Sequence, residues 1–267
     1  MKITTLMDNL VYDRHLYAEH GLSFYIEKNE RRILFDTGQS GNFIYNASLL
    51  GIDLSKVDDV VISHGHYDHT GGLYDFSKIN KTAKIHVKNG AFEKKYRRNG
   101  RDYIGCPYDK ELFAGRLNIV EKTEHLGDEI SIIPFVNIVN KDDLHYDGMK
   151  VSKEDGFIDD EFEDEQFLVV VNDGRITVIS GCSHNGITNI IETVKEVFDK
   201  PVETVIGGFH LVKNDEKQTG AVVDYFKNSD ECTLGVSHCT GIEAYGRLVS
   251  ALDNRVFYNH TGNVIQI

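Results

Sequence analysis

A short segment crowded with histidines, SHGHYDHTGG at residues 63–72, constrains this chain more than any other feature. It places His64, His66, Asp68 and His69 within six positions, directly after the apolar run DDVVIS. On a helix these side chains would scatter around the cylinder, and on a strand His69 would point away from the others. A loop at the end of a strand can bring all four together, and we expect the nearby glycines to permit the backbone angles that it needs.

The residue types of this cluster indicate a metal site. Neutral imidazole and carboxylate suit zinc, and a carboxylate also admits manganese or iron. Crowded imidazoles without a cation would each have to find a hydrogen-bond partner, and protonated imidazoles would repel one another. A divalent cation resolves both problems. The alternative, a histidine patch on the surface, does not explain the acid, the glycines and the preceding apolar run.

Length and charge limit the partners of the chain. Its 267 residues suggest one or two domains, and we expect a single domain over residues 1–267. The chain has 42 acidic and 29 basic residues, a formal net charge of −13, which argues against a nucleic-acid partner. An anionic small-molecule substrate remains the expected partner, because a bound metal can reverse the local field.

The sequence also bears on location. It has no stretch of about 18 apolar residues, so we expect no membrane partner. The first residues show no apolar core of a signal peptide, and four cysteines in a chain of this length do not resemble a disulfide framework. We therefore expect a reducing, cytoplasmic setting. The oligomeric state does not follow from the sequence.

Alternating strand and helix patterns predict an α/β fold. The run LSFYIEKNERRILFDTG predicts a hairpin of strands 22–28 and 31–36, and Asp173-Gly174 predicts a second tight turn. Further strands are expected at 58–63, 83–87, 166–172, 175–180, 202–206, 232–237, 256–258 and 263–267, and helices at 43–50, 71–79, 185–198, 216–228 and 241–252.

Two charged segments are open to more than one interpretation. The basic run KKYRR (94–98) is expected to form one exposed helix face, although its arginines could instead contact a phosphate. The acidic run DDEFEDE (159–165) is expected to be a solvated loop. The alternative is that Asp164 or Glu165 turns inward toward a metal.

The motif His64-Gly65-His66-Tyr67-Asp68-His69 resembles the H-x-H-x-D-H motif of the metallo-β-lactamase superfamily. ILFDTG (33–38) resembles an early motif of that superfamily, whose aspartate, here Asp36, supports the metal ligands. The segments EHGLSFYIE, LFDTG, LGIDLSKVDDVVISHGHYDHTGGL, SGCSHNGI, IGGFHL and SHCTG together look like the dihydropterin–ribofuranosylaminobenzene-phosphate synthase-like branch.

This resemblance runs from residue 19 to about 241 and implies a fold and a binding site. The fold is α/β, an αββα sandwich of two mixed β-sheets face to face, flanked by helices, with the metals at one edge. Residues near 88–130 fall in the segment that varies across the superfamily and often walls the pocket. Two divalent ions are implied, zinc foremost, with manganese or iron as alternatives.

The resemblance also implies further ligands. One ion is expected on His64, His66 and His184, and the other on Asp68, His69 and His238. The alternative for His184 is that it caps the helix that begins near residue 185.

Other residues near the expected strand ends have open roles. Cys182 stands where the superfamily often has a bridging aspartate, but a free cysteine at a strand end is more often a small buried apolar residue than a metal ligand. His210 could bind metal or stabilise charge on the substrate, and Cys239 is expected to be structural. The remaining histidines are interpreted as ordinary surface or core residues: His15, His20, His86, His125, His145 and His260.

Three functions follow from the resemblance. The first is a metal-dependent hydrolase in which a metal-bound hydroxide attacks a small ester or phosphate-containing substrate, with Asp68 carrying a proton to the leaving group. The second is a transferase that joins a dihydropterin to a ribofuranosylaminobenzene phosphate with release of diphosphate. The third is a non-catalytic metal-binding or sensing protein. Because one fold hosts many functions, the hydrolase is the leading prediction only.

Overall fold

The computed structural model describes residues 1–98, 100–146, 148–213, 215–229 and 232–267. Tertiary contacts divide the chain into two compact units. The first unit comprises Met1–Glu121, Tyr146–Asp164 and His260–Ile267, and the second comprises Lys122–His145 and Glu165–Asn259. The expectation of a single domain stays a prediction.

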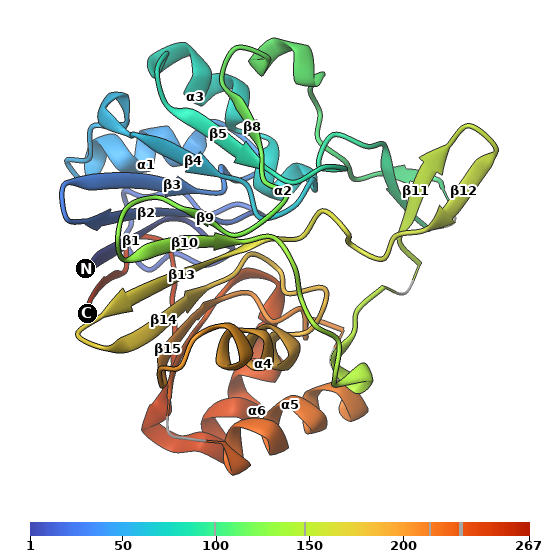
Figure 1. The fold of residues 1–267 in the computed structure, drawn as a ribbon. Coiled ribbons are helices and arrows are strands. Elements are labelled where there is room, and N and C mark those ends of the chain that lie inside the picture. Colours follow the sequence, from blue (N-terminus) through green and yellow to red (C-terminus); the bar gives the residue numbers. More distant parts are fainter. Residues whose placement is uncertain (99, 147, 214, 230–231) are drawn as a thin grey trace. The chain divides into compact units, whose positions relative to one another are not determined.

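The first unit is built on a mixed sheet with the strand order β18-β1-β2-β3-β4-β5-β8 (Figure 1). Pairing is antiparallel from β18 to β3 and parallel from β3 to β8. The strands are β1 (Lys2–Met7), β2 (Ser23–Lys28), β3 (Arg31–Phe35), β4 (Asp59–Val61), β5 (Lys84–Val87), β8 (Leu117–Ile119) and β18 (Val264–Gln266).

The predicted hairpin of β2 and β3 is confirmed. Ile26 pairs with Ile33, and the turn residues Asn29 and Glu30 both have positive φ, 49° and 65°. Such a two-residue turn twists in the same sense as the strands it joins, so the short polar sequence is enough to close the hairpin. Strand β1 was not anticipated from the sequence, although it pairs with β2 along its length.

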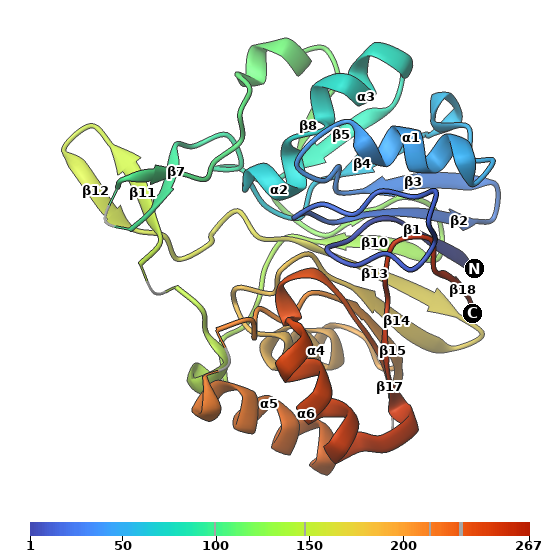
Figure 2. The same ribbon diagram turned by 180° about the vertical axis from the view of Figure 1, so that it is seen from behind.

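Helices α1 (Asn42–Leu49) and α3 (Leu73–Ile79) lie on one face of this sheet in both views (Figure 1, Figure 2). Both were predicted. Phe43 of α1 and Phe76 of α3 belong to a buried apolar cluster that also includes Leu34 and Val60 of the sheet. The unit also contains the short helices α2 (Tyr67–Thr70), η1 (Leu54–Lys56) and η2 (Lys110–Phe113).

A smaller sheet of the first unit corrects the interpretation of the basic run at 94–98. Its order is β12-β11-β6-β7, and the run forms β6 rather than a helix. Lys95 is buried on β6, whereas Arg97 and Arg98 are exposed. The strands are β6 (Lys95–Arg97), β7 (Asp102–Tyr103), β11 (Lys150–Lys153) and β12 (Gly156–Asp159).

The second unit contains another mixed sheet, in the order β17-β16-β15-β14-β13-β10-β9. Strands β14 to β17 run parallel, and β13 pairs antiparallel with both β14 and β10. The strands are β9 (Glu124–His125), β10 (Ile130–Ile133), β13 (Phe167–Asn172), β14 (Arg175–Ile179), β15 (Val202–Gly207), β16 (Thr233–Val236) and β17 (Val256–Tyr258).

Three predicted helices of the second unit are present as α4 (Ile187–Val197), α5 (Glu216–Asn228) and α6 (Ile242–Leu252). They lie on one face of the β13–β15 region, with α5 and α6 side by side (Figure 2). Strands β14, β15 and β16 are thus each followed by a loop and a helix. The expected class, α/β with two mixed sheets and flanking helices, is confirmed. Among the described residues, no helix has the length and apolarity to cross a membrane.

Candidate metal centre

The histidine cluster of the first unit occupies the loop after β4 and the start of α2. Its glycines are required for space, which corrects the expectation that they supply unusual backbone angles. A Cβ on Gly65 would lie 2.1 Å from the carbonyl oxygen of Ala91, and one on Gly71 would lie 2.1 Å from that of Gln39. Neither glycine has positive φ. The loop is therefore packed tightly against its neighbours.

Asp36 fixes the orientation of one histidine. Its carboxylate accepts hydrogen bonds from the backbone N–H and hydroxyl of Ser63, both at 2.7 Å, and lies 2.6 Å from Nδ1 of His69. All three side chains are fully buried. A carboxylate on Nδ1 selects the tautomer whose lone pair is on Nε2, as in many metal-binding histidines. The support expected from Asp36 is thus a contact with His69, whose role as a metal ligand stays a prediction.

The three imidazoles of the loop lie close together. The ring centroid of His64 is 4.6 Å from that of His66 and 4.2 Å from that of His69. Burial, followed by the neighbouring imidazoles, lowers the pKa of His64 well below its ordinary value, and burial lowers the pKa of His66 to about 3. Both rings are therefore neutral near pH 7, the form in which imidazole binds a metal.

Asp68 lies beside the same group and contacts His20, a histidine that the motifs do not assign to the site. Its Oδ2 is 3.1 Å from Nε2 of His20 and 4.0 Å from Nε2 of His69. The side chain of His20 is 52% exposed, so it links the buried carboxylate to solvent. His20 lies two residues before the predicted strand 22–28, within the segment EHGLSFYIE, but nothing in that segment marks it as a partner of Asp68.

The acidic run at 159–165 is not a solvated loop. In the first unit, Asp160 and Asp164 are buried and contact Nζ of Lys95 at 2.7 and 2.8 Å. Asp164 also accepts a hydrogen bond of 2.8 Å from the backbone N–H of Gly65. Asp164 does turn inward, as the alternative prediction had it. Its observed partners are Lys95 and the backbone of the histidine loop.

Phe162 interrupts the acids and packs against the same loop. Its ring centroid is 5.3 Å from that of His66 and 6.2 Å from that of His64, and Nζ of Lys95 lies 5.1 Å from it. The residue is buried with a positive φ of 51°. Because a bulky residue adopts this backbone only when its surroundings enforce it, the packing of Phe162 indicates a rigid wall beside the histidines.

Glu165 performs a similar role in the second unit, where it holds the loop of His184. Its carboxylate accepts hydrogen bonds from the backbone N–H groups of His184 at 2.6 Å and Asn185 at 2.9 Å. His184 does not cap helix α4, whose N-cap is Gly186. The alternative of a capping histidine is therefore wrong, and His184 is a fully buried imidazole in a loop after β14.

A cluster of imidazoles surrounds His184 in this unit. The ring centroid of His210 is 4.2 Å from that of His184 and 4.0 Å from that of His145. Nδ1 of His184 lies 3.3 Å from the carbonyl oxygen of His145. His145, interpreted as an ordinary surface or core histidine, is buried within this group, and whether it has a role in the site stays open to test. It lies in the polar region before residue 165, where no motif distinguishes it.

Strained backbone marks the strand ends of the second unit. Ser183, His210 and His238 have φ values of 55°, 47° and 50°. Left-handed backbone in residues other than glycine is uncommon and concentrates at functional sites. His238 is buried in the loop after β16, as predicted, next to Cys239.

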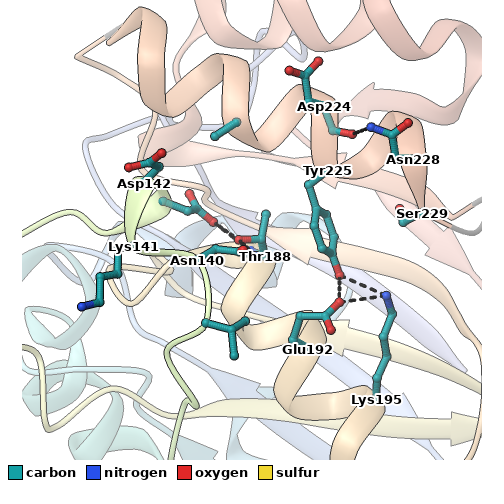
Figure 3. Close-up of a pocket in the computed structure, with 13 residues that line it drawn as sticks. Asn140, Lys141, Asp142, Thr188, Glu192, Lys195, Asp224, Tyr225, Asn228 and Ser229 are labelled. Carbon is teal, nitrogen blue, oxygen red and sulfur yellow. Dashed lines mark hydrogen bonds and ion pairs between the residues drawn. The ribbon is translucent and has the colours of Figure 1, made fainter.

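A separate cavity of about 710 Å³ lies among η3 (Lys141–Asp143), α4 and α5 of the second unit (Figure 3). Tyr225 and Lys195 both donate to Oε1 of Glu192 in its wall, and Asp142 and Thr188 also line it. None of the described residues that line the cavity belongs to the predicted site. The cavity is therefore distinct from the histidine clusters of both units.

Comparisons with known proteins agree with the motif. The family model of the metallo-beta-lactamase superfamily matches residues 16–192. Uncharacterized protein MJ0448 of Methanocaldococcus jannaschii is 34% identical, covering 99% of this chain and 100% of that protein. The 7,8-dihydropterin-6-methyl-4-(beta-D-ribofuranosyl)-aminobenzene-5'-phosphate synthase of the same organism is 28% identical, covering 100% of this chain and 96% of the synthase.

The chain is also similar to solved structures. The crystal structure of Tm1679, described as a metal-dependent hydrolase of the beta-lactamase superfamily, has a TM-score of 0.87 and 31% identity, covering 100% of this chain and 99% of that one. Zn²⁺-bound PqqB from Methylobacterium extorquens has a TM-score of 0.61 and 12% identity over the full length of both chains. At that identity the likeness concerns the fold alone.

Proposed function

The chain belongs to the metallo-beta-lactamase superfamily, and from this premise we propose that it is a metal-dependent hydrolase of a small ester or phosphate-containing substrate. The observation that carries the proposal is the loop after β4. It brings three imidazoles together beside Asp68. Burial keeps two of them, His64 and His66, neutral, and Asp36 anchors the third, His69. This donor set fits zinc, manganese or iron.

The proposed metal ligands are the residues that the motifs predict: His64, His66, Asp68, His69, His184 and His238. We propose up to two divalent ions, with zinc foremost. A bound divalent ion lowers the pKa of water toward neutrality and polarises an ester or phosphoryl oxygen.

The protein's own groups hold and move the proton. Asp68 takes the proton that the attacking water loses and gives it to the leaving group. The partly exposed ring of His20 lies 3.1 Å from Asp68 and connects this carboxylate to solvent. Asp36 keeps the His69 ring in one tautomer and orientation. Phe162 excludes water from one side of the imidazoles.

The substrate is proposed to be an anionic small molecule. The net charge of −13 does not favour an anion at long range, so its binding has to come from local groups. His210 was predicted to be either a substrate contact or a metal ligand. Its position, partly buried and next to two imidazoles, supports either role.

Replacing His66 by alanine tests the proposal. We expect the His66→Ala variant to lose metal content and ester or phosphodiester hydrolysis together, because the residue is a ligand and a loop substitution leaves the sheet intact. His15→Ala, at an exposed histidine of the same unit, is the matched control. Elemental analysis and a substrate panel are the measurements, and unchanged metal stoichiometry in His66→Ala would refute the assignment.

A transferase is the second candidate, favoured by the full-length similarity to the synthase. The reaction would join a dihydropterin to a ribofuranosylaminobenzene phosphate with release of diphosphate. Incubating the metal-loaded protein with dihydropterin diphosphate and the aromatic acceptor distinguishes the two. Formation of the coupled product supports the transferase, whereas hydrolysis without coupling supports the hydrolase.

A further inference from the structure

Three loops of the second unit carry potential metal ligands at equivalent positions. Cys182, His210 and Cys239 each lie three residues beyond the last residue of β14, β15 and β16, respectively. These strands are adjacent and parallel. Ligands of α/β proteins are bound at the carboxyl ends of parallel strands, where successive loops meet at one edge of the sheet.

The strand register places the three loops level with one another. Ile179 at the end of β14 pairs with Ile206 of β15, and Gly207 at the end of β15 pairs with Val236 at the end of β16. The backbone N–H of Gly208 then donates to the carbonyl oxygen of Gly181, in the loop after β14, at 2.8 Å. The loops therefore continue side by side beyond the ladder.

The side chains converge. Sγ of Cys182, Sγ of Cys239 and a ring nitrogen of His210 all lie within 4.8 Å of one another. In a tetrahedral zinc site with Zn–S near 2.3 Å and Zn–N near 2.0 Å, ligand atoms are roughly 3.5–3.8 Å apart. Small rotations of the side chains would bring the three atoms onto one ion. Both cysteines are buried, and His210 is only partly buried, which leaves an approach from solvent.

The position of Cys239 depends on a glycine. A Cβ on Gly208 would lie 2.5 Å from Sγ of Cys239, so any other residue at 208 would displace the sulfur. The same thiol lies 3.6 Å from the carbonyl oxygen of Cys182. A cysteine that only fills a core packs among apolar side chains, whereas this one is held against backbone at a strand end.

We propose that Cys182, His210 and Cys239 form a thiolate-rich site for a divalent ion such as zinc. Binding converts the two thiols to thiolates and releases two protons, while His210 binds as neutral imidazole. Two sulfurs and one nitrogen with a fourth position open is a donor set typical of a reactive zinc site. None of these three residues is among the six ligands proposed above, and the assignment makes His210 a ligand of this second site. It also gives Cys239 a role beyond structure.

Cobalt reports on this site through its sulfur ligands. The full chain, treated with a chelator and dialysed, is titrated with Co²⁺, and the sulfur-to-cobalt charge-transfer band is followed in the near ultraviolet. We expect the band to appear as this site fills, and about two protons to be released in a weakly buffered solution for each ion bound there. Imidazole and carboxylate ligands give no such band, so the histidine cluster of the first unit is silent.

Variants of the three ligands give the decisive result. Cys182→Ser and Cys239→Ser should abolish the band, and His210→Gln should weaken Co²⁺ binding at least about tenfold. Cys232→Ser in the second unit and Cys106→Ser in the first are matched controls, and both variants should retain the charge-transfer band. His66→Ala should also keep it, which separates this proposal from the hydrolase centre.

Three outcomes would overturn the proposal. They are a folded wild-type chain without the band, a band that survives Cys239→Ser, and a band that His66→Ala abolishes. Far-UV circular dichroism shows whether each variant is folded. If the buried cysteine variants fail to fold, His210→Gln decides the matter, because its side chain is partly exposed and its loss creates no internal cavity.

Discussion

Buried charges far along the chain hold the histidine loop of the first unit in place. Lys95 lies between Asp160 and Asp164, which are 65 and 69 residues away from it in sequence. Burial opposes the charge on Lys95, but the two carboxylates outweigh it and raise the pKa of Lys95. Burial raises the pKa of Asp160. At Asp164 the nearby Lys95 outweighs burial, so the pKa of Asp164 is lowered. We conclude that Lys95 and Asp164 form the ion pair that supports Gly65.

Lys95→Met should destabilise the protein strongly. Removing one partner of a buried ion pair leaves an uncompensated charge and typically costs about 3–5 kcal/mol. Urea unfolding measures the loss, and Lys94→Met, at the exposed neighbouring lysine, should stay within about 0.5 kcal/mol of wild type. Equal stabilities of the two variants would contradict a structural ion pair.

Glu165→Gln should weaken metal binding with little loss of secondary structure. The glutamine has only one acceptor oxygen for the backbone N–H groups of His184 and Asn185, so the His184 loop is less firmly oriented. Loss of such support typically reduces metal affinity by about 10–100-fold. Competition with a chromophoric chelator measures the affinity. Glu163→Gln, at an exposed acid of the same run, is the control, and equal affinities would show that Glu165 does not position the loop.

The local sequence pattern predicts the elements of this fold best in the hairpin and where strands and helices alternate. The hairpin of β2 and β3, the parallel strands β14 to β16 and the helices α4 to α6 all follow their sequence signals. The basic run at 94–98 was misread because its strand is stabilised by acids beyond residue 158, which no local window contains. His145 and His20 were missed for the same reason, since only tertiary contacts bring them to the histidine clusters.

The N-terminus of α4 predicts a pH dependence of stability. Its N-cap, Gly186, offers no side chain, and Asp143 from η3 instead accepts from the backbone N–H and hydroxyl of Thr188, both at 2.8 Å. Burial nevertheless raises the pKa of Asp143 from 3.8 to about 7. The folded state therefore binds a proton that the unfolded state has released between about pH 4 and 7. Asp143 thus contributes stability below about pH 4 and loses it as the pH rises to 7.

Asp143→Asn should flatten this part of the stability profile. Asparagine stays neutral and still accepts from Thr188, so the decline of about 1.4 kcal/mol per unit of pKa shift should disappear. The free energy of urea unfolding at about pH 5 and pH 8 measures it. Asp142→Asn, at an exposed neighbour paired with Lys217, should keep the wild-type slope. An unchanged slope in Asp143→Asn would contradict the assignment of the proton.

The path of the chain connects its last residues to its first strand. After the second unit ends at Asn259, residues His260–Ile267 return to the first unit, where β18 pairs with β1 (Figure 2). Thr261 accepts a hydrogen bond from the backbone N–H of the fully buried Asp8 at 2.8 Å, and Thr5 donates to the carbonyl oxygen of Asn263 at 3.0 Å. The closing segment therefore completes the edge of the first sheet.

Removing residues 263–267 should loosen the first unit selectively. β1 becomes an edge strand, and each lost backbone hydrogen bond costs about 1 kcal/mol. Hydrogen exchange should speed up at Thr5, which loses its acceptor, while Val178 in β14 of the second unit stays protected. Val264→Ala keeps the ladder and trims only a half-exposed side chain, so it should exchange like wild type. Equal acceleration at Thr5 and Val178 would show that the two units open together, and no acceleration at Thr5 would show that β18 does not protect β1.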